Sequence, residues 1–158
     1  MWQVVKGLFV STDADARDFE TLNAAKITHI VNCAIELPNY HPDQFAYLRL
    51  NLKDPDDSMI SSIEESCRFI ENGRMKGNVV VHCRGAISRS PAIALSYLCY
   101  CEMSILSAAE QLSEVVRTRP NELFLRQIMV HFGEKVDERK LSILRQILSG
   151  TEDSAYSQ

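Results

Sequence analysis

The chain has 158 residues, of which 46% are hydrophobic and 24% are charged, and its net charge is −4. These values suit one globular domain and exclude a wholly disordered chain. The acidic balance argues against a nucleic-acid-binding or anionic-membrane-binding surface, and no apolar run approaches the roughly 20 residues of a membrane span.

The first third of the chain alternates predicted strands with one predicted helix. Two short apolar runs at 4–5 and 8–10 predict strands, and an Ala-rich stretch behind a capping signal predicts a helix over 13–25. A β-branched run predicts a strand over 27–33, and alternating apolar residues predict another over 46–52.

The middle of the chain contains a turn, an amphipathic helix and a buried strand. Residues 54–58 have the composition of a turn that leads into a helix. Apolar residues at helical spacing predict that helix over 59–72, and we expect Gly73 and Gly77 to end it. The wholly apolar run over 79–81 predicts a strand that is buried on both faces.

The last part of the chain is helical, with predicted helices at 91–103, 105–118, 121–132 and 136–148. Strand–helix alternation followed by helices predicts an α/β fold, with a central mixed, mostly parallel sheet flanked by helices. We expect a single domain over 1–149, in which 136–148 is an extra C-terminal helix, and a flexible tail over 150–158.

Cellular location is suggested by two features of the sequence. The start of the chain lacks the charged beginning and long apolar centre of a signal peptide. The five cysteines form no metal-like C-x2-C pair, so we expect reduced thiols in a reducing compartment. We therefore expect a monomer in the cytoplasm or nucleus, with no nucleic-acid partner and no membrane partner.

The segment 82–91, HCRGAISRSP, joins the most buried strand to the most buried helix, where α/β sheets carry their sites. Backbone N–H groups of the small loop and the helix N-terminus can bind an oxyanion and lower the pKa of Cys83. Arg89 can bind two phosphate oxygens bidentately. The segment therefore indicates phosphoryl transfer to sulfur, and the alternative is a buried cysteine without a chemical role.

This motif resembles the signature loop of the cysteine-dependent protein tyrosine phosphatases. His82-Cys83-x5-Arg89-Ser90 is similar to the loop of the whole family, and Ser88-Arg89-Ser90-Pro91 is similar to its dual-specificity branch. Further similar stretches lie at 7–10, 27–32, 47–54, 108–109, 120–121 and 124–128. The resemblance covers residues 4–133 and implies the fold described above.

The resemblance also implies a role for each residue of the motif. Cys83 would be the nucleophile, Asp54 the general acid, and Ser90 an aid to turnover of the phosphocysteine, while His82 would orient the loop. The phosphate would be bound by the loop residues Arg84, Gly85, Ala86, Ile87, Ser88 and Arg89. Asp56 and Asp57 remain alternatives for the acid, and no metal or other cofactor is implied.

The implied activity is hydrolysis of phosphotyrosine and of phosphoserine or phosphothreonine in phosphorylated proteins. One alternative keeps the chemistry but changes the substrate to a phosphoinositide, a glucan phosphate or an RNA 5′-phosphate. The other is an inert phosphate-binding module. It arises because the family loop usually reads C-x-x-G-x-x-R, whereas here Ala86 occupies the glycine position and Gly85 precedes it.

Three details of the sequence leave open questions. Either Ala86 adopts a left-handed conformation or Gly85 takes the difficult backbone angles. Arg119 directly precedes Pro120-Asn121, whereas the family usually has several more residues between its basic stretch and Pro-Asn. This difference leaves open the shape of the rim of the phosphate-binding pocket. Cys33 ends a strand that resembles the neighbour of the catalytic strand. It is hypothesised to form a disulfide that protects Cys83, and the alternative is a packed thiol.

Overall fold

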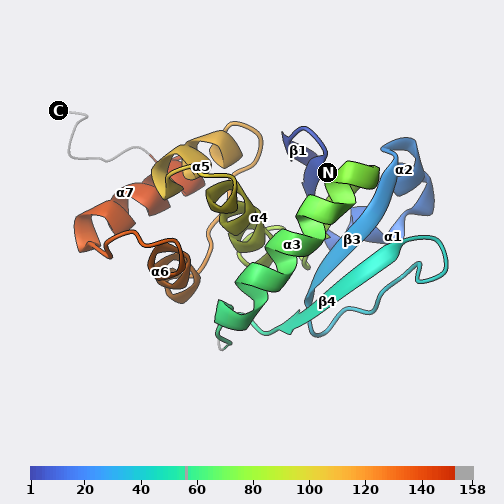
Figure 1. Ribbon diagram of the computed structural model, residues 1–158, viewed down its shortest axis with the longest axis horizontal. Coiled ribbons are helices and arrows are strands. Elements are labelled where there is room, and N and C mark those ends of the chain that lie inside the picture. Colours follow the sequence, from blue (N-terminus) through green and yellow to red (C-terminus); the bar gives the residue numbers. More distant parts are fainter. Residues whose placement is uncertain (56, 152–158) are drawn as a thin grey trace.

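The computed structural model describes residues 1–55 and 57–151, and a five-stranded sheet forms its centre (Figure 1). Across the sheet the strands are β1 (Trp2–Val5), β2 (Leu8–Ser11), β5 (Asn78–His82), β3 (Ile27–Ala34) and β4 (Ala46–Leu52). β1 pairs antiparallel with β2, and all other neighbours are parallel. The predicted mixed, mostly parallel sheet is therefore confirmed, with β5 and its apolar residues 79–81 at its centre.

Helices cover both faces of the sheet. One face is covered by α3 (Ile60–Lys76) and α4 (Arg89–Tyr100), onto which α5 (Ile105–Ser113), α6 (Glu122–His131) and α7 (Glu138–Ser149) pack (Figure 1). The other face carries α1 (Asp13–Arg17) and α2 (Phe19–Ala24). Alternate residues of β5 serve the two sides: Val79 and Val81 join the larger core, while Val80 joins a smaller core with Leu22 of α2.

Two predicted helices differ from those observed, each for a local reason. The helix expected over 13–25 is divided at Asp18, whose backbone is extended and whose carboxylate accepts the Glu20 N–H at 3.1 Å. Gly73 does not end α3, which continues to Lys76. A Cβ on Gly73 would lie 2.6 Å from Val79 Cγ2, so this glycine lets α3 approach β5 closely.

The helix expected over 105–118 ends at Ser113, and the chain that follows binds to α7 and to the loop after β5. We use the term strap for residues 117–121. Its Thr118 N–H donates to Leu148 O of α7 at 2.9 Å, and its Arg119 N–H donates to Ile87 O at 2.7 Å. The strap therefore links α7 to the loop that follows β5.

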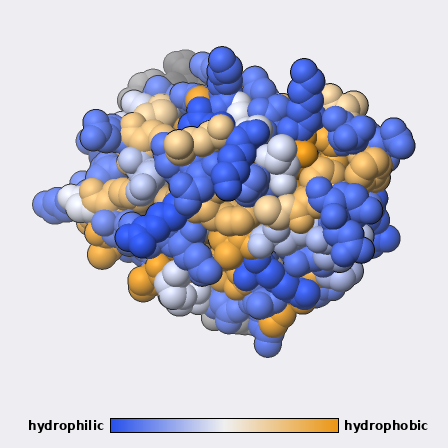
Figure 2. Space-filling view, turned by 45° about the vertical axis from the view of Figure 1, so that its right-hand side comes forward, coloured by the Kyte–Doolittle hydropathy of each residue, from blue (hydrophilic) through white to orange (hydrophobic). Residues whose placement is uncertain are grey.

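The surface is mixed in character. On the face shown in Figure 2, hydrophilic side chains surround a discontinuous band of apolar ones. Large exposed apolar side chains are spread over different elements, with Met75 on α3, Ile87 in the loop after β5 and Val130 on α6. Within the described residues, no helix has the length and apolar character needed to cross a membrane.

Candidate active site

The loop between β5 and α4 is held in place by three other segments of the chain. We call residues 83–89 the phosphate loop. Asp13 at the start of α1 donates its N–H to Arg84 O at 2.9 Å, and the strap binds Ile87 O through Arg119. Asn121, also in the strap, donates its N–H to Ser88 Oγ at 2.9 Å. These contacts fix the loop at the carboxyl end of β5, where the sequence predicted a site.

The thiol of Cys83 lies at the base of this loop. Cys83 directly follows β5 and is 3% exposed, and its Sγ lies 3.1 Å from Oγ of the buried Ser90. Ser90 belongs to the first turn of α4, whose N-terminus carries a partial positive charge. A hydroxyl at this distance can donate a hydrogen bond to a thiolate. The structure therefore brings together the expected nucleophile, Cys83, and the residue expected to aid turnover of the phosphocysteine, Ser90.

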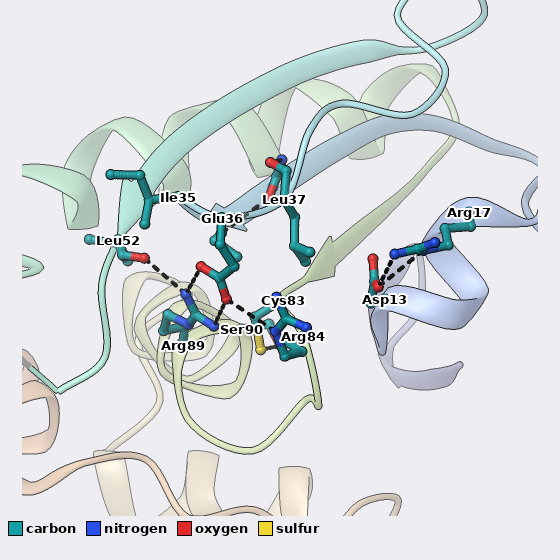
Figure 3. Close-up of polar contacts among 12 residues, drawn as sticks. Asp13, Arg17, Ile35, Glu36, Leu37, Leu52, Cys83, Arg84, Arg89 and Ser90 are labelled. Carbon is teal, nitrogen blue, oxygen red and sulfur yellow. Dashed lines mark hydrogen bonds and ion pairs between the residues drawn. The ribbon is translucent and has the colours of Figure 1, made fainter.

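A carboxylate that the sequence did not identify binds Arg89. Glu36 accepts from Nη1 of Arg89 through Oε2 at 2.7 Å and from Nη2 through Oε1 at 2.6 Å, and Nη1 also donates to Leu52 O at 3.0 Å. Figure 3 shows the Glu36 carboxylate between the side chains of Arg89 and Arg84, with Cys83 and Ser90 beside them. Arg84 Nε lies 3.5 Å from Glu36 Oε1.

This ion pair sets the charge state of Glu36. The hydrogen bond from Arg89 lowers the pKa of Glu36 to about 2, so the carboxylate is ionised at any pH at which the protein would work. Glu36 lies two residues beyond the end of β3, at the same edge of the sheet as Cys83. That position is the signal by which the sequence could have identified it, since the carboxyl ends of parallel strands meet there.

His82 is the last residue of β5 and is almost completely buried. Burial lowers its pKa from 6.5 to about 4, so the ring is neutral at neutral pH. Neither ring nitrogen has a hydrogen-bond partner among the described residues. His82 is therefore a buried neutral residue next to Cys83 in the chain, and its expected role in orienting the loop stays a prediction.

The expected acid lies on an exposed turn. We call residues 53–58 the acid turn; Asp56 lies outside the described residues. Asp54 Oδ1 accepts from Nδ2 of Asn121 at 2.7 Å. Asp57 closes the turn instead: its Oδ2 accepts the Lys53 N–H at 2.8 Å, and its own N–H donates to Lys53 O at 3.1 Å. Of the two described candidates, Asp54 contacts the residue that also braces the phosphate loop.

The two neighbouring small residues of the phosphate loop adopt different conformations. Ala86 has a left-handed backbone with φ of 55°, and Gly85 is not among the residues with positive φ. A Cβ added to Gly85 would meet only Ile87 Cγ1, at 3.3 Å. Of the two possibilities that the sequence left open, the structure has the first: the alanine, and not the glycine, carries the left-handed turn.

Cys33 and Cys83 follow paired residues of adjacent strands. Asn32 of β3 is in register with His82 of β5, and each cysteine comes next in its chain. Cys33 is fully buried, and burial together with the nearby Cys83 raises its pKa well above the usual value. The proposed disulfide therefore stays a prediction, with a packed neutral thiol as its alternative.

Comparisons with known proteins agree with these observations. Residues 8–134 match the family described as "Dual specificity phosphatase, catalytic domain". The chain is 33% identical to human protein phosphatase Slingshot homolog 3 over 147 residues, which cover 90% of this chain and 22% of that protein. This chain therefore spans about a fifth of the length of that relative.

Solved structures show the same similarity. The crystal structure of human DUSP28 has a TM-score of 0.79 at 25% identity, with 84% of this chain and 96% of that chain covered. The crystal structure of DUSP15 has a TM-score of 0.76 at 26% identity and covers 96% of both chains. Coverage of 96% leaves too few residues to omit α7 entirely, so at least part of this helix has a counterpart in DUSP15.

Proposed function

The chain belongs to the dual-specificity phosphatase family, whose members are cysteine-dependent enzymes, and we propose that it hydrolyses phosphotyrosine and phosphoserine or phosphothreonine monoesters in proteins. The observation that carries this proposal is the placement of Cys83 at the end of β5, 3.1 Å from Ser90 and within the loop that carries Arg89. A nucleophile at the base of an oxyanion-binding loop suits phosphoryl transfer to sulfur.

In the first step, the Cys83 thiolate attacks phosphorus. The Sγ–P bond forms as the bond between phosphorus and the substrate oxygen breaks. Asp54 donates its proton to the leaving oxygen, which would otherwise depart as an unstable alkoxide or phenoxide. Arg89 and the backbone N–H groups of residues 84–89 bind the three remaining phosphoryl oxygens and stabilise their charge in the transition state.

In the second step, water hydrolyses the phosphocysteine. The Asp54 carboxylate, deprotonated by the first step, accepts a proton from the attacking water. The electrons of the S–P bond return to Sγ, and inorganic phosphate leaves. The Ser90 hydroxyl, 3.1 Å from Sγ, donates a hydrogen bond to the departing thiolate and so favours this step. The cycle closes with Cys83 as thiolate and needs no cofactor.

The charges at the mouth of the site favour a phosphoprotein over a polyanionic substrate. Arg84 is the only cation of the phosphate loop besides Arg89, and it shares the carboxylate of Glu36 with that residue. Asp54 adds a second carboxyl group. A phosphoinositide or an RNA end carries further phosphates, which would call for unpaired cations here.

A panel of substrates tests the proposal. We expect release of phosphate from phosphotyrosine and phosphothreonine peptides, and much slower release from a phosphoinositide, a phosphorylated glucan and an RNA 5′-phosphate. If any of the last three is hydrolysed faster than the phosphopeptides, the proposed substrate class is wrong and the proposed chemistry still holds. A generic aryl phosphate measures the chemistry alone.

The strained Ala86 favours one second candidate, an inert phosphate-binding module. An alanine with φ of 55° costs conformational energy where the family has glycine, and a distorted loop could bind phosphate without activating the thiol. Failure of the reduced chain to hydrolyse the aryl phosphate, with phosphate binding retained, would establish this candidate in place of the enzyme.

A further inference from the structure

A groove with a volume of about 540 Å³ lies between the strap and α7, and the start of α6 also lines it (Figure 1). We call it the strap groove. The strap is fixed on both sides: Thr118 N–H donates to Leu148 O of α7 at 2.9 Å, while Arg119 N–H donates to Ile87 O of the phosphate loop at 2.7 Å. The strap groove and the phosphate loop therefore share the strap as a common wall.

Two arginines line the strap groove, and neither guanidinium has an acceptor among the described residues. They are Arg119 of the strap and Arg145 of α7, and both are exposed. The carboxylates that line the groove, Glu122 and Glu138, are bound instead by Arg126, whose Nη2 lies 2.6 Å from an oxygen of each. Three arginines against two carboxylates leave a local excess of one positive charge.

The walls of the strap groove also carry polar groups that suit an anionic ligand. The side chains of Ser142 and Gln146 line it and have no hydrogen-bond partner among the described residues. Thr118 lines it and is 1% exposed, and among those residues its Oγ1 has no partner either, although buried hydroxyls in folded proteins almost always have one. The N-terminus of the ten-residue helix α6 adds a partial positive charge. The groove therefore offers two cations and several hydrogen-bonding groups to a ligand.

We propose that the strap groove binds acidic side chains of the protein substrate that flank the phosphorylated residue. The proposal rests on the proposed function, since it names a class of substrate for the same site. Asn121 gives the spatial reason: it lines the groove, its N–H binds Ser88 and its Nδ2 binds Asp54. A substrate with its phosphoryl group in the phosphate loop therefore reaches the groove within a few residues, each of which spans about 3.3–3.6 Å when extended.

The charges of the strap groove favour carboxylates of a peptide over a polyanion. The excess is a single positive charge, and Glu122 and Glu138 remain in the wall. A phosphoinositide or a nucleic-acid end would bring several negative charges beside these carboxylates, and like charges at short range repel. One or two substrate carboxylates can instead each bind one guanidinium, with the bidentate geometry that arginine and carboxylate prefer.

Three phosphotyrosine peptides of equal length test the proposal. One has neutral residues on both sides of the phosphotyrosine, one has acidic residues before it, and one has acidic residues after it. For the native chain, kcat/KM should be about 5- to 30-fold higher for one of the acidic peptides than for the neutral one, because an exposed ion pair contributes up to about fivefold and the groove offers two. This ratio should shrink as the salt concentration rises.

Substitution of both arginines should remove the preference. In the Arg119→Gln/Arg145→Gln double variant the ratio should lie within about twofold of one, and Arg119→Gln keeps the backbone N–H that binds Ile87 O. The ratio compares two peptides on the same protein, so a general loss of activity in the variant does not change it. The control is Arg139→Gln, which replaces an exposed arginine of α7 that does not line the groove and should keep the native ratio.

A ratio near one in the native chain, or equal ratios in the native chain and the double variant, would overturn the proposal. A preference that appears only after Glu152→Gln and Asp153→Asn would also overturn it, because the groove would then bind residues of this chain. Binding of the three peptides to the Cys83→Ser chain, measured by fluorescence anisotropy, makes the same comparison without turnover. A preference in binding with no turnover by the native chain would keep the groove and refute the proposed function, whereas equal turnover of all three peptides would do the reverse.

Discussion

The phosphate loop and the acid turn serve the same proposed reaction but are built in opposite ways. The phosphate loop is bound by α1, the strap and the segment after β3, and its Cys83 and Ala86 are buried. In the acid turn Asp54 is exposed, and among the described residues its side chain has one hydrogen bond, from Asn121. In the proposed reaction, the group that binds the phosphoryl oxygens is therefore held by several parts of the fold, whereas the proposed proton donor is held by one contact at the surface.

Asn121 is the residue that connects the two regions. Its N–H braces Ser88, its Oδ1 caps α6 by accepting the Phe124 N–H at 2.9 Å, and its Nδ2 holds Asp54. The hydrogen bond to Phe124 fixes the Asn121 side chain. Asn121, which also binds the phosphate loop, therefore sets the position of Asp54 relative to that loop. The difference between the two regions can be tested by substitutions in each.

Loss of the nucleophile should have the largest effect and should leave the braced loop intact. Cys83→Ser should reduce hydrolysis of an aryl phosphate by at least roughly 10³-fold, since an enzyme that loses its nucleophile loses the covalent route. It should still bind phosphorylated substrate, because Arg89 and the loop N–H groups remain. Turnover within tenfold of the wild type would contradict the role given to Cys83.

Loss of the acid should cost less and should depend on the leaving group. Asp54→Asn should slow hydrolysis of phosphopeptides by about 10²–10⁴-fold, the usual contribution of a positioned proton donor. The loss should shrink for aryl phosphates whose leaving group needs no proton. Measurement of kcat/KM across a series of leaving groups checks this.

Asp57→Asn is the matched control for the acid. Its carboxylate accepts the Lys53 N–H within the turn, so its removal should loosen the turn and produce a smaller loss that does not vary with the leaving group. A steep dependence on the leaving group in Asp57→Asn, or in Asp56→Asn, would move the acid to that position.

The sequence predicted the fold and the Cys83 motif because both depend on local patterns. The wholly apolar run at 79–81 identified β5, and the small residues after it marked a loop that opens a helix. Glu36 was missed because its position beyond the end of a strand is a weak signal by itself. Its importance comes from contact with Arg89, 53 residues away. The division of the first predicted helix at Asp18 was also missed. An aspartate can lie within a helix as well as at its N-cap, so the residue type alone does not mark a break.

The burial of His82, the last residue of β5, predicts that the free energy of unfolding depends on pH. Burial lowers the pKa of His82 from 6.5 to about 4, so the unfolded chain takes up the proton first as the pH falls. Stability is therefore complete above pH 6.5 and declines between pH 6.5 and 4, by about 3 kcal/mol in total. Urea denaturation across this range should show the slope in the wild type.

His82→Asn provides the comparison for that experiment. The variant should be less sensitive to pH over the same range, whatever its stability at neutral pH, and the difference in slope isolates His82 from His29, whose pKa burial also lowers. Equal slopes would mean that His82 is not kept neutral by its burial.

Cys33 of β3, the strand next to β5, offers a test with a smaller expected effect, which depends on oxidation of Cys83. Peroxide would convert the Cys83 thiolate to a sulfenic acid, and attack by Cys33 would form the disulfide and release water. Wild type inactivated by a brief treatment should then recover with a reducing agent, whereas Cys33→Ser should recover less. Cys67→Ser is the control, a buried thiol on α3. Equal recovery of wild type and Cys33→Ser would leave Cys33 as a packed thiol.

The smallest effect is expected at Ala86, where three contributions oppose one another. Glycine would remove the cost of roughly 1–2 kcal/mol for a left-handed alanine, but it would add about 0.5–1 kcal/mol of chain entropy and lose about 0.8 kcal/mol from one buried methyl group. Ala86→Gly should therefore change the free energy of unfolding by less than about 1 kcal/mol and leave turnover unchanged.

Gly85→Ala completes this test. The substitution would be harmful if Gly85 adopted strained backbone angles or if a methyl group crowded the loop. Gly85 has no positive φ, and the added Cβ would meet only the exposed, flexible Ile87 side chain. We therefore expect a mild effect, measured by thermal melts and kinetics of both single variants. If Ala86→Gly instead makes an inert chain active, the native loop is too distorted for catalysis, and the braced region binds phosphate without cleaving its esters.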